Sequence, residues 1–389
     1  MPCREAGLLP PSALAGWSLV SVDWSTAKTV WAAAKPMNTE ELLLAQAQSI
    51  AAAFGGSTRT WVYRNSIKAL PWFSSVREKL ADPAYHDWFL PFGVCARNAS
   101  CHVPLCDTNY HPPLCSSLYH DQVQTPGFPH GDGNCAAPAC DVGDVPVGEY
   151  VFNPLAANVS VRNQTLLEWF LDGYLFSPTG AGAGSPISGF FFDDQLGPTG
   201  PTEMDGRAFA DMGVNASQGA ALSAAYYAFM AAVYAALPAR GAFSWQQLWT
   251  APGGGFTPAK IGTTCPEPLV ARGSCAADLR ALCNATSPAW TRATMSAFSP
   301  GRCKTDTANL TSPLQDVAAF LLVRGPFSWI GFGWEGCDRN FSYPPELDLD
   351  VGEPLGLCEE SAPNVWTRRW SGANVSLNCT AWTANITML

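Results

Sequence analysis

The feature that most constrains the fold is a short apolar run over residues 187–192, which ends directly on Asp193 and Asp194. Its three consecutive phenylalanines leave no polar face, and glycine and proline residues bound it on both sides. A run of this length and composition predicts a fully buried strand rather than a helix. In parallel α/β folds the carboxyl ends of such strands face the ligand. The two acids can therefore reach a cleft without placing charge in the core.

Strand and helix patterns alternate along most of the chain. Strands are predicted at 19–24, 60–65, 149–154, 187–194, 242–249, 293–298 and 329–333, and helices at 39–54, 73–80, 164–176, 219–237, 276–283 and 312–323. This alternation favours a parallel α/β architecture. Roughly eight such units favour a closed (β/α)8 TIM barrel over an open sheet.

The 389 residues could form one barrel with insertions or two average domains. We predict a single barrel domain over residues 17–370. Residues 95–148 are rich in Cys, Pro, Gly and His, lack any periodicity, and are far longer than an ordinary loop. They predict a disulfide-rich insertion, and residues 371–389 predict a small C-terminal β extension.

Cysteines and glycosylation motifs indicate the compartment. The 14 cysteines form an even set that lies mostly in loop-like sequence, which favours disulfide bonds. Asn-x-Ser/Thr motifs occur at Asn98, Asn158, Asn163, Asn215, Asn284, Asn309, Asn340, Asn374, Asn378 and Asn385. Together they predict a secreted glycoprotein, although residues 1–17 show no apolar signal core. No apolar stretch approaches the roughly 20 residues that span a bilayer, so we expect no membrane span.

Composition also limits the partners. The net charge of −10, with 22 Lys plus Arg and no basic cluster, argues against nucleic acid and anionic membrane surfaces. No Gly-rich dinucleotide or phosphate motif opens a helix, so no cofactor is predicted. All five histidines lie between residues 86 and 130 among several cysteines. A zinc site is the alternative there, but the spacing matches no standard ligand pattern, and we predict no metal. We expect a monomer.

Two carboxyl groups at strand ends can divide acid and base work when one is protonated and the other ionised, as glycoside hydrolysis requires. Side chains of adjacent strand residues point to opposite sides, so only one of Asp193 and Asp194 is expected to face the cleft, with Asp194 preferred. The second carboxyl is predicted to be Glu335, whose aromatic neighbours Trp329 and Trp334 would desolvate it and raise its pKa.

Other residues near predicted strand ends could bind a neutral poly- or oligosaccharide. Aromatic faces stack on sugar rings, side-chain amides bind hydroxyls, and a cation can orient an acid. The predicted substrate-binding residues are Asp23, Arg64, Asn65, Glu149, Trp245, Gln247 and Trp329.

Structural roles are the alternative for each of these residues. Asp193 and Asp194 could cap a helix or pair with Arg64 or Arg324 at the barrel mouth. Lone acids and tryptophans are also often structural. A non-catalytic carbohydrate-binding or cell-surface protein on the same barrel would keep this pattern without two converging acids.

The order of motifs resembles a known group of families. Asn153-Pro154, a helix, and a Gly-Phe-Phe-Phe-Asp-Asp strand end follow one another. This order is similar to that of glycosyl-hydrolase-like (β/α)8 TIM-barrel families, over about residues 17–370. Segments 343–348, 352–356 and 365–369 resemble the closing part of those families. The resemblance implies a glycoside hydrolase fold. The Cys-rich insertion, and Ser188 in place of an aspartate, depart from the pattern.

Overall fold

The structure is a computed structural model. It describes residues 4–91, 105–107, 114–120, 145, 148–194, 196–197, 200–201, 212–246, 270, 272–285, 296–298, 312–325, 328–330 and 345–389. For some strand residues among these only the backbone is described. The chain forms two compact units, an N-terminal unit (Pro2–Ala242) and a C-terminal unit (Phe243–Leu389).

Three parallel strands form the centre of the N-terminal unit. Strands β1 (Leu19–Val22), β2 (Arg59–Asn65) and β9 (Ile187–Asp193) lie in the order β1–β2–β9. The β1–β2 and β2–β9 pairs are both parallel, and Asn65 is the register partner of Asp193. Side chains on both faces of β9 are buried, as the sequence predicted. Parallel pairing brings the carboxyl ends of all three strands to one edge of the sheet.

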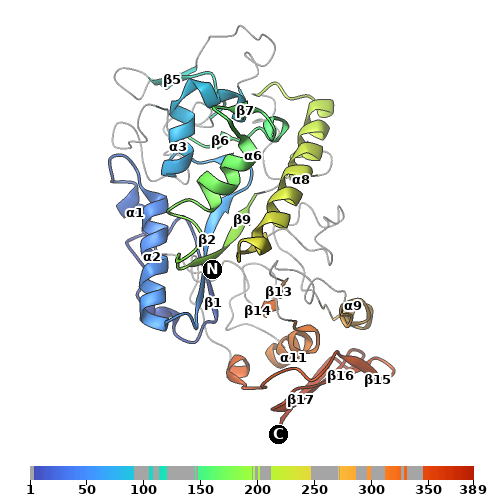
Figure 1. Ribbon diagram of the computed structural model, residues 1–389. Helices are drawn as coiled ribbons and strands as arrows, with labels where there is room; N and C mark the ends of the chain where they lie inside the picture. The colour runs from blue at the N-terminus through green and yellow to red at the C-terminus, as the bar shows by residue number, and fades with distance from the viewer. Residues whose placement is uncertain are drawn as a thin grey trace. The chain divides into compact units, whose positions relative to one another are not determined.

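Helices α2 (Thr39–Phe54) and α8 (Ala216–Ala239) flank these strands in the view of Figure 1, α2 to the left and α8 to the right. Helix α2 spans the predicted residues 39–54, and the left-handed Gly55 ends it. Glycine adopts this conformation without steric cost, which is why it commonly terminates helices. Helix α3 (Ser74–Ala81) follows β2 as predicted.

The helix predicted at 164–176 has two parts. Thr165 and Glu168 form a capping box at the start of α6 (Leu166–Trp169), which continues as the π-helix η5 (Phe170–Leu175). The remaining elements of this unit are η1 (Pro11–Leu14), α1 (Lys28–Trp31), β3 (Lys68–Ala69), η2 (Pro83–Trp88), β4 (Leu105–Asp107), β5 (Leu114–Ser116), β6 (Tyr150–Val151), η4 (Pro154–Ala156), β7 (Ser160–Val161), β8 (Gln164–Thr165), β10 (Leu196–Gly197) and β11 (Gly200–Pro201).

Strand β6 corrects one prediction. Residues 149–154 were expected to add a third strand to the parallel sheet, but β6 pairs antiparallel with β3 in a separate ladder. The ladder is short because Asn153 caps the helix η4, which begins at Pro154. A proline has no amide proton to continue a ladder. The register pairs Lys68 with Val151 and Ala69 with Tyr150.

Helix α8 corrects another prediction. Its 24 residues carry no charged side chain, and by length and composition it could cross a membrane. The expectation that no apolar stretch approaches 20 residues was therefore wrong. Its Tyr226, Phe229 and Met230 are buried in the N-terminal unit. A packed core helix has the same composition, because its large apolar side chains face the interior.

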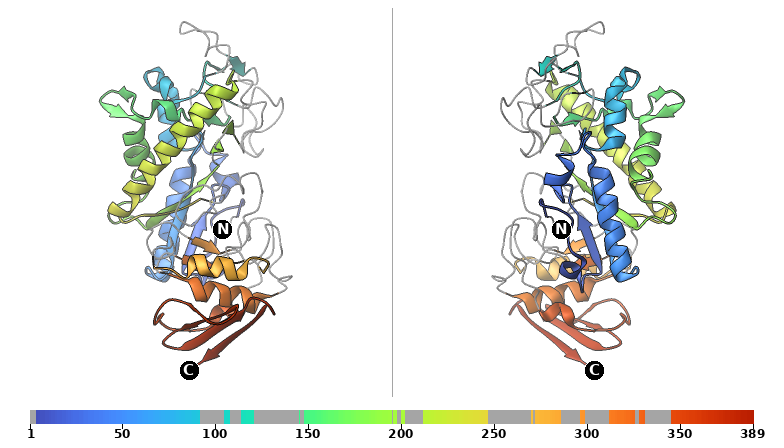
Figure 2. Two further views of the ribbon diagram at one scale, coloured as in Figure 1. Left: turned by 90° about the vertical axis from the view of Figure 1, so that its right-hand side faces the viewer. Right: turned by 90° about the vertical axis from the view of Figure 1, so that its left-hand side faces the viewer.

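The C-terminal unit contains an antiparallel sheet formed by β15 (Glu359–Ala362), β16 (Val365–Arg369), β17 (Ala373–Asn378) and β18 (Thr383–Met388). Helix α11 (Pro313–Val323) lies against one face of it (Figure 2). The buried Arg368 of β16 donates hydrogen bonds to the carbonyls of Leu321 and Leu322 at the end of α11. These bonds satisfy acceptors that a helix terminus leaves unpaired.

Two disulfide bonds join α9 (Cys275–Leu282) and the residue that follows it to the sheet region. Cys275 bonds to Cys379, and Cys283 bonds to Cys358. The unit also contains β12 (Phe243–Gln246), the parallel pair β13 (Ser296–Phe298) and β14 (Ser328–Ile330), and η8 (Pro345–Asp348).

The structure therefore has α/β content with a parallel sheet. No closed eight-stranded sheet is formed by the residues that it describes. The β extension predicted at 371–389 corresponds to β17 and β18, which pair with the preceding strands. The Cys-rich segment 95–148 lies mostly outside the described residues, apart from the β4–β5 hairpin and a few neighbours.

Candidate functional site

Acidic residues gather where the parallel strands of the N-terminal unit end. Asp23 follows β1, Asp193 ends β9, and Asp194 follows directly. All three carboxylates raise the pKa of the buried Tyr63 hydroxyl on β2, after burial itself, which is the largest cause. Tyr63 thus stays a neutral phenol at physiological pH. Because all three carboxylates raise the pKa of the same hydroxyl, they form one cluster around it.

The backbone at Asp194 explains how neighbouring acids reach the same place. Asp194 has a φ of 55°, in the left-handed region that few residues other than glycine adopt. This turn ends the extended alternation, so the two side chains do not diverge as those of a regular strand would. Both acids therefore act on the cluster, and which of them faces a cleft stays a prediction. Strained backbone of this kind is concentrated at functional sites.

The carboxyl of Asp193 has a strongly raised pKa. Burial raises its pKa, the negative charge of Asp194 raises it further, and the charge of Asp23 adds a smaller increase. The backbone amide of Asp194 and the cation of Lys68 act in the opposite direction, and the resulting pKa is about 8. An ordinary aspartate is ionised at pH 7. Asp193 instead retains its proton at neutral pH.

Lys68 forms ion pairs with two carboxylates of the cluster. Its Nζ lies 3.4 Å from Oδ2 of Asp194 and 2.9 Å from Oε2 of Glu149. Burial lowers the pKa of Lys68, but the two carboxylates together raise it well above its usual value. The ammonium is therefore charged and paired with two acids. The β3–β6 ladder brings Lys68 and Glu149 together.

Asn65 connects this cluster to the strand ends. Its Nδ2 donates to Oδ2 of Asp194 at 2.7 Å and to the hydroxyl of Tyr63 at 2.8 Å. Its Oδ1 accepts from the amides of Ile67 and Lys68 at 2.9 and 2.6 Å. An asparagine that bonds to the backbone two and three residues ahead forms a turn. With both ends of its amide engaged, Asn65 fixes the orientation of Asp194.

Ser66 fixes the backbone of the same pair. Its hydroxyl lies 2.7 Å from the carbonyl oxygen of Asp194 and 3.1 Å from that of Asp193. The hydroxyl of Tyr226 on α8 lies 2.8 Å from the Ser66 hydroxyl. The amide of Ser66 also donates to the Asp193 carbonyl at 3.0 Å. These bonds hold the turn that the left-handed Asp194 requires.

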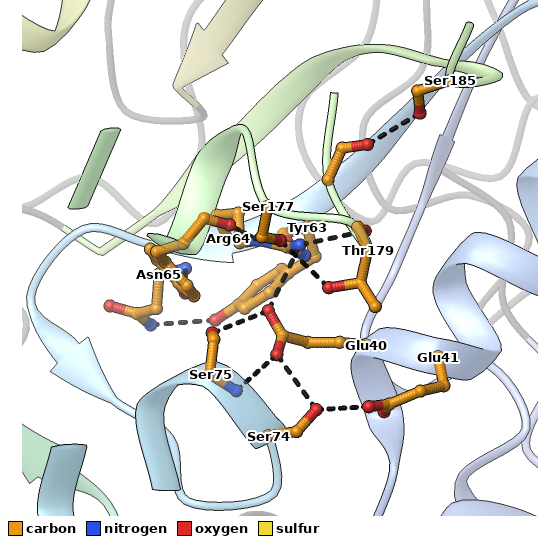
Figure 3. A network of polar contacts seen from close by, with 12 residues as sticks. Glu40, Glu41, Tyr63, Arg64, Asn65, Ser74, Ser75, Ser177, Thr179 and Ser185 are labelled. Carbon is orange, nitrogen blue, oxygen red and sulfur yellow. Dashed lines mark hydrogen bonds and ion pairs between the residues drawn. The ribbon is translucent and has the colours of Figure 1, made fainter. Parts of the chain in front are cut away.

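Arg64 points away from the acids. It lies between Tyr63 and Asn65 on β2, so its side chain leaves the opposite face of the sheet. Its guanidinium is fully buried and lies 3.4 Å from the carboxylate of Glu40 on α2. Figure 3 shows this pair, with Ser75 bound to the same carboxylate. Arg64 thus joins α2 to the sheet, and it has no contact with Asp193 or Asp194 among those the structure shows.

The structure brings together five of the ten residues proposed from the sequence, namely Asp23, Asn65, Glu149, Asp193 and Asp194. Glu335 and Gln247 lie outside the described residues, as does the side chain of Trp245. Trp329 is half-buried on β14, where its ring packs edge-on against Phe243 at 6.1 Å between centroids.

Three residues of the cluster were missed from the sequence. Lys68 lies outside any strand that the pattern predicted, while Tyr63 and Ser66 lack a distinctive motif. The Asn65-Ser66-Ile67-Lys68 segment does carry a signal, because asparagine after a strand favours a turn. That signal predicts the turn but not its partners. Among the described residues, no group of three or more His, Cys, Asp or Glu side chains could hold a metal ion.

Comparison with known proteins gives only distant likenesses. No protein-family model matches the chain, and no curated protein does. The cyclic α-maltosyl-(1→6)-maltose hydrolase from Arthrobacter globiformis, in its ligand-free form, is 13% identical, with a TM-score of 0.41. The alignment covers 95% of this chain and 83% of that one. The complex of that enzyme with maltose is also 13% identical, with a TM-score of 0.42 over 93% of this chain and 78% of that one.

An α-galactosidase from Geobacillus stearothermophilus in complex with stachyose is 10% identical, with a TM-score of 0.39. The alignment covers 94% of this chain but 43% of the galactosidase. These identities and TM-scores are too low to assign an activity or a family to this chain.

Proposed function

We propose that the protein is a glycoside hydrolase-like enzyme in which Asp193 and Asp194 divide the work of acid and base. The observation that carries this proposal is the contrast between the two neighbours. Asp193 has a pKa of about 8, whereas Asp194 is paired with the cation of Lys68. Two carboxyl groups with opposite protonation states are what glycoside hydrolysis needs at neutral pH.

In the proposed reaction the protonated Asp193 donates its proton to the glycosidic oxygen as the bond to the sugar breaks. The carboxylate of Asp194 stabilises the positive charge that develops on the sugar, and acts as nucleophile or as base for water. Glu335, which the sequence predicts as the second carboxyl, would take the role of the acid if Asp193 does not. Asn65 and Lys68 keep Asp194 oriented and ionised, and Asp23 favours the protonated form of Asp193.

The proposal extends to the surroundings of the site. The parallel strands would belong to a (β/α)8 barrel over residues 17–370. Glu149, next to the β3–β6 ladder, and Trp245, Gln247 and Trp329 are the further residues proposed to bind the saccharide. The two disulfide bonds favour an oxidising compartment, so the protein would be a secreted glycoprotein. It would act as a monomer.

A non-catalytic saccharide-binding protein is the second candidate, and one observation favours it. Asp194 is engaged by both Lys68 and Asn65, as a structural acid would be. Removing either partner of a buried pair costs stability whether or not the pair is catalytic. Activity measurements therefore have to separate the two candidates.

The first test is release of reducing sugar from a panel of polysaccharides and aryl glycosides. We expect the wild-type chain to be active and both Asp193→Asn and Asp194→Asn to lose at least about 100-fold in kcat, the scale of general acid–base catalysis. Asp172→Asn is the matched control, because it removes an exposed carboxylate that pairs with Arg240. Saccharide binding without hydrolysis, unaffected by both substitutions, would support the binding protein instead.

The second test uses pH. A general acid must be protonated, so kcat/KM is expected to fall as the pH rises through about 8, the pKa of Asp193. Lys68→Met removes a cation that lowers this pKa, and should move the alkaline limb of the profile to higher pH. Lys68→Arg keeps the charge, and should leave the limb nearer its original position. An identical limb in the wild type and Lys68→Met would exclude Asp193 as the acid.

A further inference from the structure

The outward face of the C-terminal sheet carries three Asn-x-Ser/Thr motifs within 14 residues. On β17, Ala373, Val375 and Leu377 are buried, so the residues between them face outward. An acceptor asparagine and the hydroxyl two residues later therefore share this face. The register pairs Asn374 with Thr387. This alternation places the motifs beginning at Asn374 and Asn385 on neighbouring strands of one outward face.

The two strand motifs are open to a modifying enzyme. Asn374 and Asn385 are both exposed. The side-chain amide of Asn385 donates to the hydroxyl of Thr387, within its own motif, at 3.0 Å. Thr387 is exposed as well. A glycan on either asparagine would extend from the face opposite to the one that α11 covers, so it would not disturb the core.

The third motif, Asn378-Cys379-Thr380, is different because its middle residue is half of a disulfide. Cys379 is bonded to Cys275, whose side chain is 2% exposed on α9. Asn378 is half-buried, and its Oδ1 accepts from the amides of Thr380 and Ala381 at 3.0 and 2.9 Å. Once the Cys275–Cys379 disulfide has formed, Asn378 is held at the end of β17 and is not accessible to the modifying enzyme.

We propose that Asn374 and Asn385 carry N-linked glycans, and that Asn378 is a conditional site that is modified only while Cys379 is unpaired. In the transfer, Nδ2 of the asparagine bonds to C1 of the first sugar of a lipid-linked oligosaccharide diphosphate. The bond from C1 to the diphosphate oxygen breaks, the lipid diphosphate leaves with the electron pair, and the amide loses one proton. Pairing of Cys379 with Cys275, which transfers two electrons to a disulfide-donating oxidant, closes the third site.

Glycan occupancy at these sites does not depend on the hydrolase activity. Occupancy of Asn378 reports whether the Cys275–Cys379 bond forms before or after glycan transfer. A chain whose Cys275–Cys379 bond forms early would leave Asn378 bare. A chain in which the bond forms late would carry a third glycan next to the buried cystine.

The test is site occupancy in the full chain, expressed behind a cleavable leader in a eukaryotic secretory cell. Release of glycans by an amidase in heavy-oxygen water converts each occupied asparagine into a labelled aspartate. Chymotryptic cleavage after Leu377 and Trp382 places each of the three acceptors in its own peptide for mass spectrometry. In the wild type we expect label at Asn374 and Asn385 and little at Asn378.

Cys275→Ser frees Cys379 without altering the Asn378 motif, and should raise occupancy of Asn378 several-fold. Cys283→Ser breaks the other disulfide and is the matched control, which should leave occupancy of Asn378 at the wild-type level. Occupancy is measured on intracellular chains as well as secreted ones, so retention of a misfolded variant does not hide the result. Full occupancy of Asn378 in the disulfide-bonded wild type, equal increases in both variants, or bare Asn374 and Asn385 would each overturn the proposal.

Discussion

At the residue scale, the unusual property of the site is an aspartate that keeps its proton. Its folded-state pKa of about 8 lies above the ordinary value of 3.8. Below pH 4 the carboxyl is protonated in both the folded and the unfolded chain. Between about pH 4 and 8 the unfolded chain loses this proton while the folded chain keeps it, so ionisation favours unfolding. Asp193 therefore lowers the free energy of unfolding across this range.

Asp193→Asn removes that titration. We expect the free energy of unfolding of the variant, minus that of the wild type, to increase from about pH 4 to about pH 8 and then to level off. The slope of the increase is at most about 1.4 kcal/mol for each pH unit. Urea denaturation at a series of pH values measures this difference. A difference that does not change between pH 4 and 8 would contradict the raised pKa.

At the element scale, β9 positions the acids because it is anchored along its whole length. Phe190, Phe191 and Phe192 are each 0% exposed. The ring of Phe191 packs 5.9 Å from that of Tyr63 on β2, between centroids. A one-residue shift would move every side chain of β9 to the other face and disrupt this packing, so the packing favours the register that aligns Asn65 with Asp193.

Phe191→Ala should accordingly lower the free energy of unfolding by about 3–5 kcal/mol, as is typical for a large aromatic side chain removed from a core. Val30→Ala, at a side chain that is 48% exposed, is the control and should change it by less than about 0.5 kcal/mol. Chemical denaturation of the two variants under identical conditions gives both values. Similar losses in both would mean that β9 is not packed as described.

At the scale of the whole molecule, two disulfide bonds add to core packing in the C-terminal unit. They join the region of its antiparallel sheet to α9. The Cys275–Cys379 bond spans 104 residues of sequence. A bond that closes a loop of this length restricts the unfolded chain and typically stabilises the fold by about 2–5 kcal/mol.

The double variant Cys275→Ser/Cys379→Ser should therefore weaken the C-terminal unit selectively. Hydrogen–deuterium exchange is expected to show faster exchange in β16, β17 and β18, with protection of β2 and β9 unchanged. Because each unit has its own core, the effect should remain local. Equal loss of protection in β9 would show instead that the two units unfold together.

Elements with local signals could be predicted from the amino-acid sequence. Helix α2 follows from its spacing and its terminal glycine, and β9 follows from its uninterrupted apolar run, so their residues could be predicted closely. The acids at the end of β9 could be identified for the same reason, since their position follows directly from that of the strand. Long-range pairing is not encoded in any one segment, and the antiparallel pairing of β6 with β3 was accordingly missed.

The properties of the acids depend on contacts between segments that are distant in the sequence. Whether Asp193 and Asp194 diverge or act together depends on the left-handed backbone of Asp194, which Ser66 and Asn65 stabilise from another strand. Whether Arg64 can contact the acids depends on the face of β2 from which its side chain projects. It projects from the face opposite to Tyr63 and Asn65, where it pairs with Glu40. Protonation states depend on burial and on charges brought close by folding. Residue types are local properties of a sequence, whereas the electrostatic environment of a side chain exists only once distant segments meet.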